Sequence, residues 1–302
     1  MASSSGFPRA SPGPGFWLAA AGLAIAWRSG ARVGDPVAGG ETDPVSGAKL
    51  EARLALVIDL ASVAALIVLS SGGFLDSFSP YAEFKAQGPR FWTELARHVG
   101  LSSVAFLTAA VLAVPTAALA ARNGPSGTAL TALAGAAQNI PSLALFGLLL
   151  PALAALADAL PGLRKLGITG IGPAPAIVAL TLYALLPMVL SGAAGLAMAD
   201  PGAKDAAKGM GYSPRQAFWR VELPLALPSF LSGARTALVQ TIGTATVAAL
   251  VGAGGMGYFI FQGLGQAAMD MVIIGVVPVV ALSALTDRLM GGLQTRAERY
   301  VR

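Results

Sequence analysis

Few residues of this chain have side chains suited to catalysis or metal binding. Among its 302 residues there is one histidine, His98, and no cysteine. Zinc sites need three or four such ligands, and covalent catalysis needs a nucleophile beside a base. The sequence has no G-x-x-x-x-G-K-[ST] phosphate loop. We therefore expect no catalytic residue, no metal and no cofactor, so the chain is not expected to be an enzyme.

The most polar stretch, residues 200–224, has strong local folding signals. Asp200 precedes a proline and is typical of a helix N-cap. Gly211 suits a left-handed helix end. Ser213 begins a capping box with the glutamine three residues later. Pro224 disfavours helix at the residue before it and is expected to end the segment. The pattern predicts two short helices outside the membrane.

Two groups of polar residues lie inside otherwise apolar stretches. At membrane depth such residues usually face the bundle interior or a water-filled path. The alternative is that they hydrogen-bond one helix to another. We predict a translocation pathway or gate lined by these residues: Gln138, Asn139, Pro141, Ser142, Gln240, Thr241 and Thr244.

A glycine cluster follows the second of these polar groups. Gly252, Gly254 and Gly255 permit a tight re-entrant turn and close approach of the backbone, so we add them to the predicted pathway or gate. Aromatic rings at Tyr258 and nearby positions could make cation–π contacts with a positively charged group. Such rings more often mark the membrane interface.

The amino-acid composition indicates that membrane-spanning helices position the polar residues and glycines described above. Hydrophobic residues make up 55% of the chain, charged residues only 12%, and the mean hydropathy is +0.69. Soluble domains have about 25% charged residues. The pattern predicts an all-α polytopic membrane protein with about seven spans, or six if the first lies on the surface. The apolar stretches are residues 16–27, 54–71, 99–121, 129–150, 174–192, 228–251 and 271–285.

Basic residues give the expected orientation. Placing the loop with residues 200–224 in the cytoplasm puts 13 of the 20 Lys and Arg residues inside and six outside. A cleaved signal peptide over residues 16–27 would invert this arrangement, so we disfavour it. The net charge of +5 is too clustered to suggest nucleic-acid binding. We divide the chain into accessory N-terminal helices and linker loops (1–97), a core (98–288) and a cytoplasmic tail (289–302).

The polar stretch resembles the EAA loop of ABC-importer permeases. That pattern is Glu-Ala-Ala, three residues, Gly, nine residues, then Ile-x-Leu-Pro. Here Asp205-Ala206-Ala207, Gly211 and Val221-Glu222-Leu223-Pro224 keep the spacing, with Asp for Glu and Val for Ile. Residues 138–145 and 251–257 are similar to segments of the osmoprotectant branch, which transports glycine betaine, choline and related quaternary ammonium solutes.

This resemblance implies a type I importer permease fold of about six or seven transmembrane helices with a cytoplasmic coupling hairpin. It also implies ABC ATPase subunits, an extracytoplasmic substrate-binding protein and a second permease, the same chain or a paralogue. The expected location is the bacterial inner membrane, among lipids. Methionine-type and sulfonate-type permeases share the loop, so those solutes remain alternatives.

The resemblance assigns ATPase coupling to one set of residues. The small side chains would let the loop enter a groove on the ATPase, and the cations would pair with acidic residues at its edge. For each cation, the alternative is an ordinary solvated loop. The set comprises Lys204, Asp205, Ala206, Ala207, Gly211, Ser213, Arg215, Arg220, Leu223 and Pro224.

Two other function classes fit less well. An ion-coupled secondary transporter usually has paired repeats and buried acids, and Asp59 is the one acid that suits that role. A membrane-embedded enzyme needs convergent catalytic groups, which this chain lacks.

Overall fold

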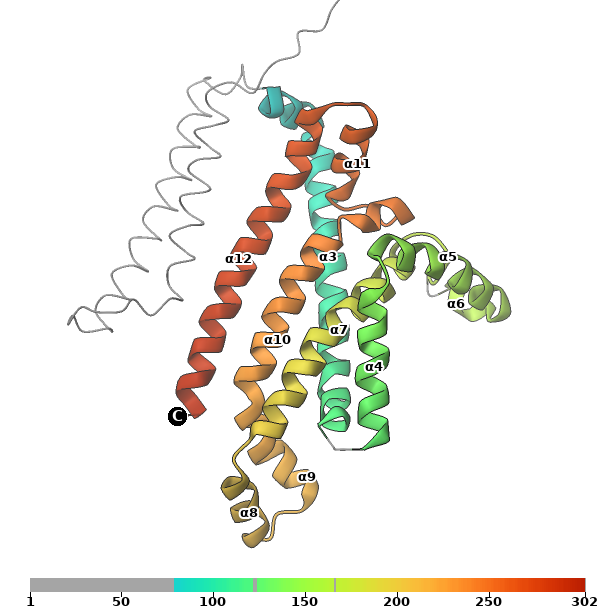
Figure 1. Cartoon of the computed structure of the whole chain (residues 1–302). Coiled ribbons are helices and arrows are strands. Elements are labelled where there is room, and N and C mark those ends of the chain that lie inside the picture. The colour runs from blue at the N-terminus through green and yellow to red at the C-terminus, as the bar shows by residue number, and fades with distance from the viewer. Residues whose placement is uncertain (1–78, 122–123, 166, 302) are drawn as a thin grey trace, which may run out of the picture. The chain divides into compact units, whose positions relative to one another are not determined.

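The computed structural model describes residues 79–121, 124–165 and 167–301, and within these ranges the regular elements are all helical (Figure 1). The chain divides into two compact units, 1–87 and 88–302. The predicted spans at residues 16–27 and 54–71, and Asp59 within the second, lie outside the described residues. The elements are α3 (Ser79–Ala120), α4 (Pro125–Asn139), α5 (Ser142–Ala159), α6 (Pro161–Lys165), α7 (Pro173–Met198), α8 (Pro201–Gly209), α9 (Pro214–Ala217), the π-helical turn η2 (Phe218–Glu222), α10 (Leu223–Thr244), the 3-10 turn η3 (Val247–Val251), α11 (Gly257–Gly265) and α12 (Met269–Val301).

Four of the described helices are long and apolar enough to cross a membrane: α3, α5, α7 and α12. This confirms the all-α polytopic class. Helix α3 begins at Ser79, well before the apolar stretch that starts at residue 99. Helix α12 continues to Val301, so residues 289–301, expected as a tail, extend the last helix.

The apolar stretch 129–150 is not one straight span. Helix α4 ends at Asn139, and α5 begins at Ser142 in a different direction (Figure 1). Between them Ile140 and Pro141 have extended backbone angles, with ψ of 124° and 135°. A proline cannot donate the hydrogen bond that would continue the helix, so the chain turns where the sequence has Pro141.

Helices α7 and α10 pack closely because glycines line their contact. A Cβ atom on Gly192 would lie 2.3 Å from the Phe230 ring, and one on Gly233 would lie 2.6 Å from the Pro187 carbonyl oxygen. Helix α3 contributes a row of fully buried alanines at every fourth position, Ala105, Ala109, Ala113 and Ala117. Small residues at contacts are typical of membrane bundles, where backbones must approach closely to gain packing energy.

Candidate functional site

Residues 200–222, here called the coupling hairpin, begin with the caps that the sequence predicts. The Asp200 carboxylate accepts hydrogen bonds from the Gly202 and Ala203 amides at 3.0 and 3.3 Å. Ser213 and Gln216 form a reciprocal capping box, with bonds of 2.9 and 3.3 Å. Each cap satisfies amides that the first turn of a helix leaves without partners.

Gly211 makes the turn between the two helices of the hairpin. Its φ of +79° is in the left-handed region, as the sequence predicts for this glycine. The Tyr212 amide donates to the Ala207 carbonyl at 3.1 Å, and the Met210 amide donates to Ala206 at 2.9 Å. These bonds close the end of α8, so the second helix can start at Pro214.

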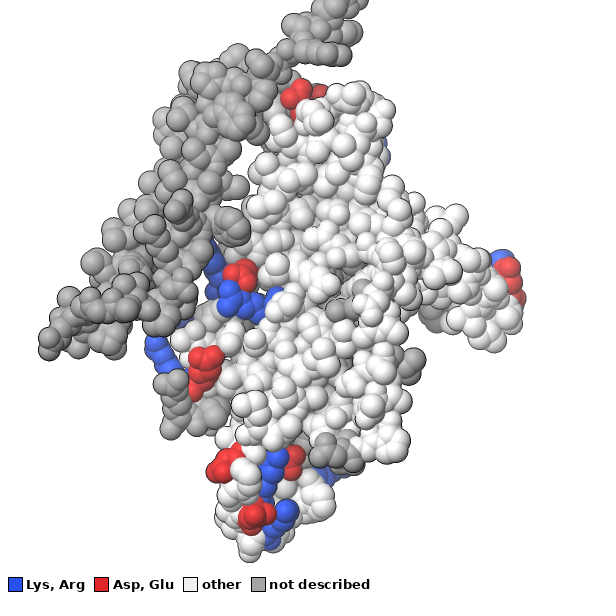
Figure 2. Space-filling view, viewed as in Figure 1, with Lys and Arg blue, Asp and Glu red and all other residues white. Residues whose placement is uncertain are grey.

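The side chains of the coupling hairpin divide into an inner and an outer set. Ala207 is fully buried, whereas Ala206, Arg215 and Arg220 are exposed. Asp205 and Lys208 form an exposed ion pair at 3.0 Å. At the tip, blue and red atoms alternate without a large patch of one sign (Figure 2).

Lys204 points back towards the bundle instead of outwards. Its ammonium group donates to the Leu196 carbonyl oxygen at 2.9 Å, near the C-terminus of α7. A cation is favourable there, because the last carbonyls of a helix lack partners and carry partial negative charge. Lys204 therefore ties the coupling hairpin to α7.

The coupling hairpin continues into α10 without a break, which corrects the expectation for Pro224. Leu223 and Pro224 are the first two residues of α10, and the preceding residues form the π-helical turn η2. The Leu223 amide donates to the Phe218 carbonyl five residues earlier. This wider turn changes the hydrogen-bond register just where proline lacks a donor, so the backbone stays helical.

Residues 252–257, here called the glycine loop, lie at the other end of α10. Gly252, Gly254 and Gly255 have φ values of +79°, +77° and +90°. The Gly255 amide donates to the buried Glu94 carboxylate at 2.7 Å. A Cβ atom on Gly254 would lie 2.7 Å from the same carboxylate. The glycines therefore serve both the turn and the close approach to α3.

Helix α3 presents three polar side chains to this end of the bundle. Arg97 forms an ion pair with Glu94 at 3.1 Å. His98 is fully buried, and its Nε2 lies 3.0 Å from the Ile242 carbonyl oxygen. The Arg97–Glu94 pair lies within α3, whereas the contacts of Glu94 with Gly255 and of His98 with Ile242 fix α3 against the glycine loop and the end of α10.

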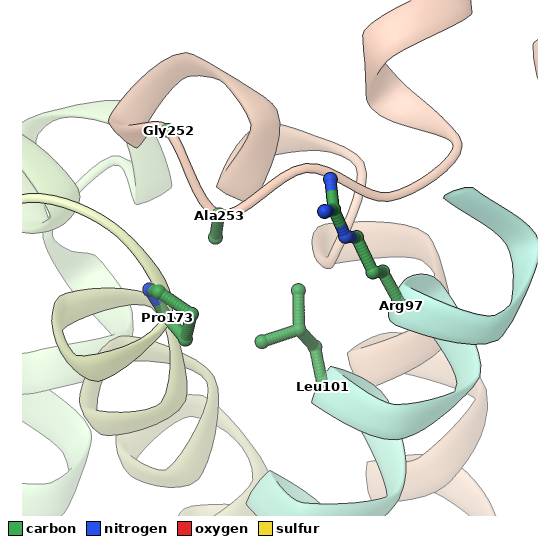
Figure 3. Close-up of a pocket in the computed structure, with 5 residues that line it drawn as sticks. All are labelled: Arg97, Leu101, Pro173, Gly252 and Ala253. Carbon is green, nitrogen blue, oxygen red and sulfur yellow. The ribbon is translucent and has the colours of Figure 1, made fainter. Parts of the chain in front are cut away.

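An open pocket of about 380 Å³ lies beside the glycine loop. The residues that line it, Arg97, Leu101, Pro173, Gly252 and Ala253, surround a common space (Figure 3). They come from α3, the start of α7 and the glycine loop. Arg97 is the one charged residue among them, and its side chain is 56% exposed.

Comparison with known proteins shows which family has a coupling hairpin and a glycine loop in this arrangement of helices. Residues 109–299, more than half of the chain, match the family described as "Binding-protein-dependent transport system inner membrane component". The chain belongs to this family. It is therefore an integral inner-membrane permease of an ABC importer rather than an enzyme, and its family implies an ATPase and a substrate-binding protein as partners.

Individual relatives agree with the family. The osmoprotectant import permease protein OsmW of Salmonella typhimurium is 34% identical over 66% of this chain and 87% of that protein. The choline transport system permease protein OpuBB of Bacillus subtilis is 31% identical over 64% and 82%. A chain of the inward-facing MetNI methionine ABC transporter has a TM-score of 0.60 at 22% identity, over 69% of this chain and 98% of that chain. This likeness supports the type I importer permease fold.

Four of the residues predicted to line the pathway or gate lie at the break between α4 and α5. A hydrogen bond from Tyr183 of α7 stabilises the backbone at this break. The Tyr183 hydroxyl donates to the Ile140 carbonyl oxygen at 2.5 Å. Asn139 and Pro141 are exposed, and Ser142 is partly buried. The side chain of Gln138 lies outside the described part. The sequence analysis missed Tyr183, because an aromatic residue in an apolar helix gives no local sign of a distant partner.

The three polar residues predicted on α10 do not share one environment. Gln240 is exposed, Thr244 is partly buried, and Thr241 is fully buried. The Thr241 hydroxyl donates to the Ala237 carbonyl of its own helix at 2.6 Å. Of these three, Gln240 is the one best placed to face a pathway.

The aromatic residues after the glycine loop already have partners within the permease. The Arg90 guanidinium lies 3.7 Å from the centre of the Tyr258 ring. Phe259 is fully buried, and its ring centre is 6.3 Å from that of Phe91. A solute cation would have to displace Arg90 to use Tyr258, so this structure favours the packing interpretation for these rings.

Glu94, Arg97 and His98 are further residues that the sequence analysis did not assign to the site. Glu94 and His98 are four residues apart and therefore lie on one face of α3. The sequence did contain a signal for this site. An acidic residue and the single histidine of the chain lie four residues apart, just before an apolar stretch.

Proposed function

We propose that this permease imports osmoprotectants, namely quaternary ammonium solutes such as glycine betaine and choline, with energy from ATP hydrolysed on separate ATPase subunits. The observation that carries this proposal is the match to relatives named for osmoprotectant import and choline transport over about two thirds of the chain. The match covers more than four fifths of each relative, so it includes nearly the whole of those permeases.

The coupling hairpin is the proposed contact with the ATPase. Exposed Ala206 offers only a methyl group, which would let a partner backbone come close, and the exposed Arg215 and Arg220 could pair with acidic groups on the ATPase. The uninterrupted helical path from α9 through η2 into α10 supports transmission of movement. A stiff connection passes a displacement of the hairpin to the membrane helix, whereas a flexible loop would absorb it.

The glycine-loop end is the proposed contact with the substrate-binding protein. It lies at the opposite end of α10 from the coupling hairpin, and its pocket opens beside Arg97. An exposed guanidinium suits a carboxylate, either on the solute or on the surface of the binding protein.

A second permease, either this chain or a paralogue, is the proposed partner within the membrane. Helix α5 supports this proposal because large apolar side chains on it are exposed, including Leu143 at 59% and Leu148 at 61%. Contact with another permease or with lipid would cover them.

The test is reconstitution of the permease in proteoliposomes with its ATPase and its binding protein. We expect ATP-dependent uptake of radiolabelled glycine betaine or choline, with radiolabelled methionine as the control solute. Uptake of methionine but of neither quaternary ammonium would overturn the substrate assignment. Uptake that persists with a hydrolysis-deficient ATPase would overturn the energy source.

A further inference from the structure

An ion pair joins the middle of α10 to α12. The Arg235 Nε and Nη2 atoms donate to the two carboxylate oxygens of Asp287 at 2.6 and 2.7 Å. This is the two-point geometry in which a guanidinium matches a carboxylate best. Both side chains are nonetheless about two fifths exposed, at 39% and 43%. The pair is therefore well formed but open on one side.

The position of Arg235 makes this exposure informative. At 1.5 Å per residue, Arg235 lies about 18 Å along α10 from Leu223 and about 13.5 Å before Thr244. If residues 228–251 span the membrane, as the sequence predicts, this is a depth where lipid chains would surround an isolated helix. Charged side chains at such depth almost always face the bundle interior or a water-filled cavity. An open ion pair there marks a surface that lipid does not cover.

A pocket of about 560 Å³ lies at the open side of the ion pair. On α10, Ser232, Thr236 and Gln240 follow one another at every fourth position and line one wall. Gln294 of α12 adds another amide. Nearly all lining side chains can form hydrogen bonds, and Val239 is the exception. We refer to this site as the α10–α12 pocket.

The ion pair has unused binding capacity. A guanidinium has five N–H donors, and the pair with Asp287 uses two nitrogen atoms. Within the described residues, Nη1 of Arg235 has no hydrogen bond and lies near the backbone of Gly291, where a Cβ would be 3.4 Å away. A carboxylate likewise accepts more than two hydrogen bonds. A solute with both charges could bind without separating the pair.

We propose that the α10–α12 pocket is a transit site for zwitterionic solutes, which carry a carboxylate and a quaternary ammonium. The solute carboxylate would bind the free side of Arg235 and the nearby amides, and its cationic group would lie beside Asp287. The volume suits a small solute, because ligand pockets usually span about 300–1,000 Å³. This inference rests on the proposed function and adds solute selectivity within the permease itself.

The first test compares two solutes in the reconstituted complex. The variant Arg235→Gln with Asp287→Asn removes both charges together, so neither is left unpaired; Asn keeps the shape of Asp, and Gln keeps a shorter polar side chain at position 235. Relative to choline, which has no carboxylate, uptake efficiency for glycine betaine should fall by about tenfold, the effect of losing roughly 1.4 kcal/mol. The control Arg296→Gln removes one charge from α12 outside the pocket and should leave this ratio unchanged.

Equal loss for both solutes would overturn the inference, because it would show that the pair only holds α10 and α12 together. An unchanged ratio with normal uptake would overturn it as well. If the unmodified complex transports neither solute, the proposed function fails, and this inference fails with it.

The second test uses the absence of cysteine from the chain. Gln240→Cys in the purified permease, without the binding protein, should react with a water-soluble thiol reagent, and Val280→Cys on α12 is the control for an apolar exposed position. Glycine betaine should slow the labelling of Gln240→Cys more than choline does. Failure of Gln240→Cys to react, or equal protection by both solutes, would overturn the proposal.

Discussion

The two ends of α10 are held in place by different kinds of contact. The coupling hairpin at one end is closed by hydrogen bonds between residues two to five apart, such as the Ser213–Gln216 box. The glycine loop at the other end is held by Glu94, which is 161 residues away from Gly255 in the sequence. The first end is mostly exposed and closed by local bonds, with Lys204 as its hydrogen bond to α7, and the other end is a buried joint. A unit of the first kind can move as a whole, whereas the second keeps helices together.

The strongest test of this comparison is a methyl group added to the buried joint. In Gly257→Ala, the new Cβ would lie 1.8 Å from the Thr246 carbonyl oxygen, so α11 must shift. We expect the free energy of unfolding to fall by about 3 kcal/mol or more, which is the upper range for overpacking of a core. The yield of monodisperse protein in size-exclusion chromatography should therefore be much lower for this variant than for the unmodified permease. Gly265→Ala on the same helix meets open space and is the control. Equal yields for the two variants would contradict a tightly packed joint.

Removing the Glu94 carboxylate is expected to have the next largest effect. Glu94→Ala leaves the Gly255 amide buried without its partner, which costs about 2–3 kcal/mol for a hydrogen bond to a charged group. The thermal midpoint of the purified permease should fall. Glu94→Gln keeps an acceptor oxygen and should lose less. If both variants are as stable as the unmodified permease, Glu94 does not hold the glycine loop.

Replacing Gly211 in the coupling hairpin should affect coupling to the ATPase more than the stability of the permease. Gly211→Ala forces a side chain into the left-handed region, at a cost of about 1–2 kcal/mol that is confined to the exposed turn. We expect a near-normal thermal midpoint and reduced stimulation of ATP hydrolysis by the binding protein. Gly209→Ala, two residues earlier, meets open space and ordinary helical geometry, so it should leave both readouts unchanged. A large drop in thermal midpoint for Gly211→Ala would show that this turn also supports the fold of the helix bundle.

The smallest effect is expected for the exposed pair on α8. Asp205 and Lys208 are each 74% exposed, and ion pairs in water contribute little because solvent screens them. Lys208→Ala should leave the thermal midpoint within experimental error in 0.05 M and 0.5 M salt, the two conditions of this measurement. A salt-dependent loss of stability would mean that this pair supports the fold.

The same contrast explains what could be predicted from sequence. The caps at Asp200 and Ser213 and the left-handed turn at Gly211 are confirmed, because each depends on residues a few positions apart. The break at Pro141 follows from a local rule as well. The partner of Gly255 depends on tertiary packing, which no local pattern encodes.

Pro224 shows how context changes even a local rule. Proline disfavours helix before it, yet the π-helical turn supplies a register in which Leu223 remains helical. The roles of the pathway residues stay predictions. Thr241 illustrates why, because its sequence context resembles that of Gln240 although its side chain is fully buried.

The most direct measurement of the central claim is cross-linking from the two ends of the bundle. A photoactivatable thiol reagent is attached at Ala206→Cys in the coupling hairpin or at Ile171→Cys, which is exposed next to the glycine loop. In the assembled complex, our account predicts cross-links to the ATPase from position 206 and to the binding protein from position 171. Cross-links to the ATPase from position 171, or none from position 206, would contradict it.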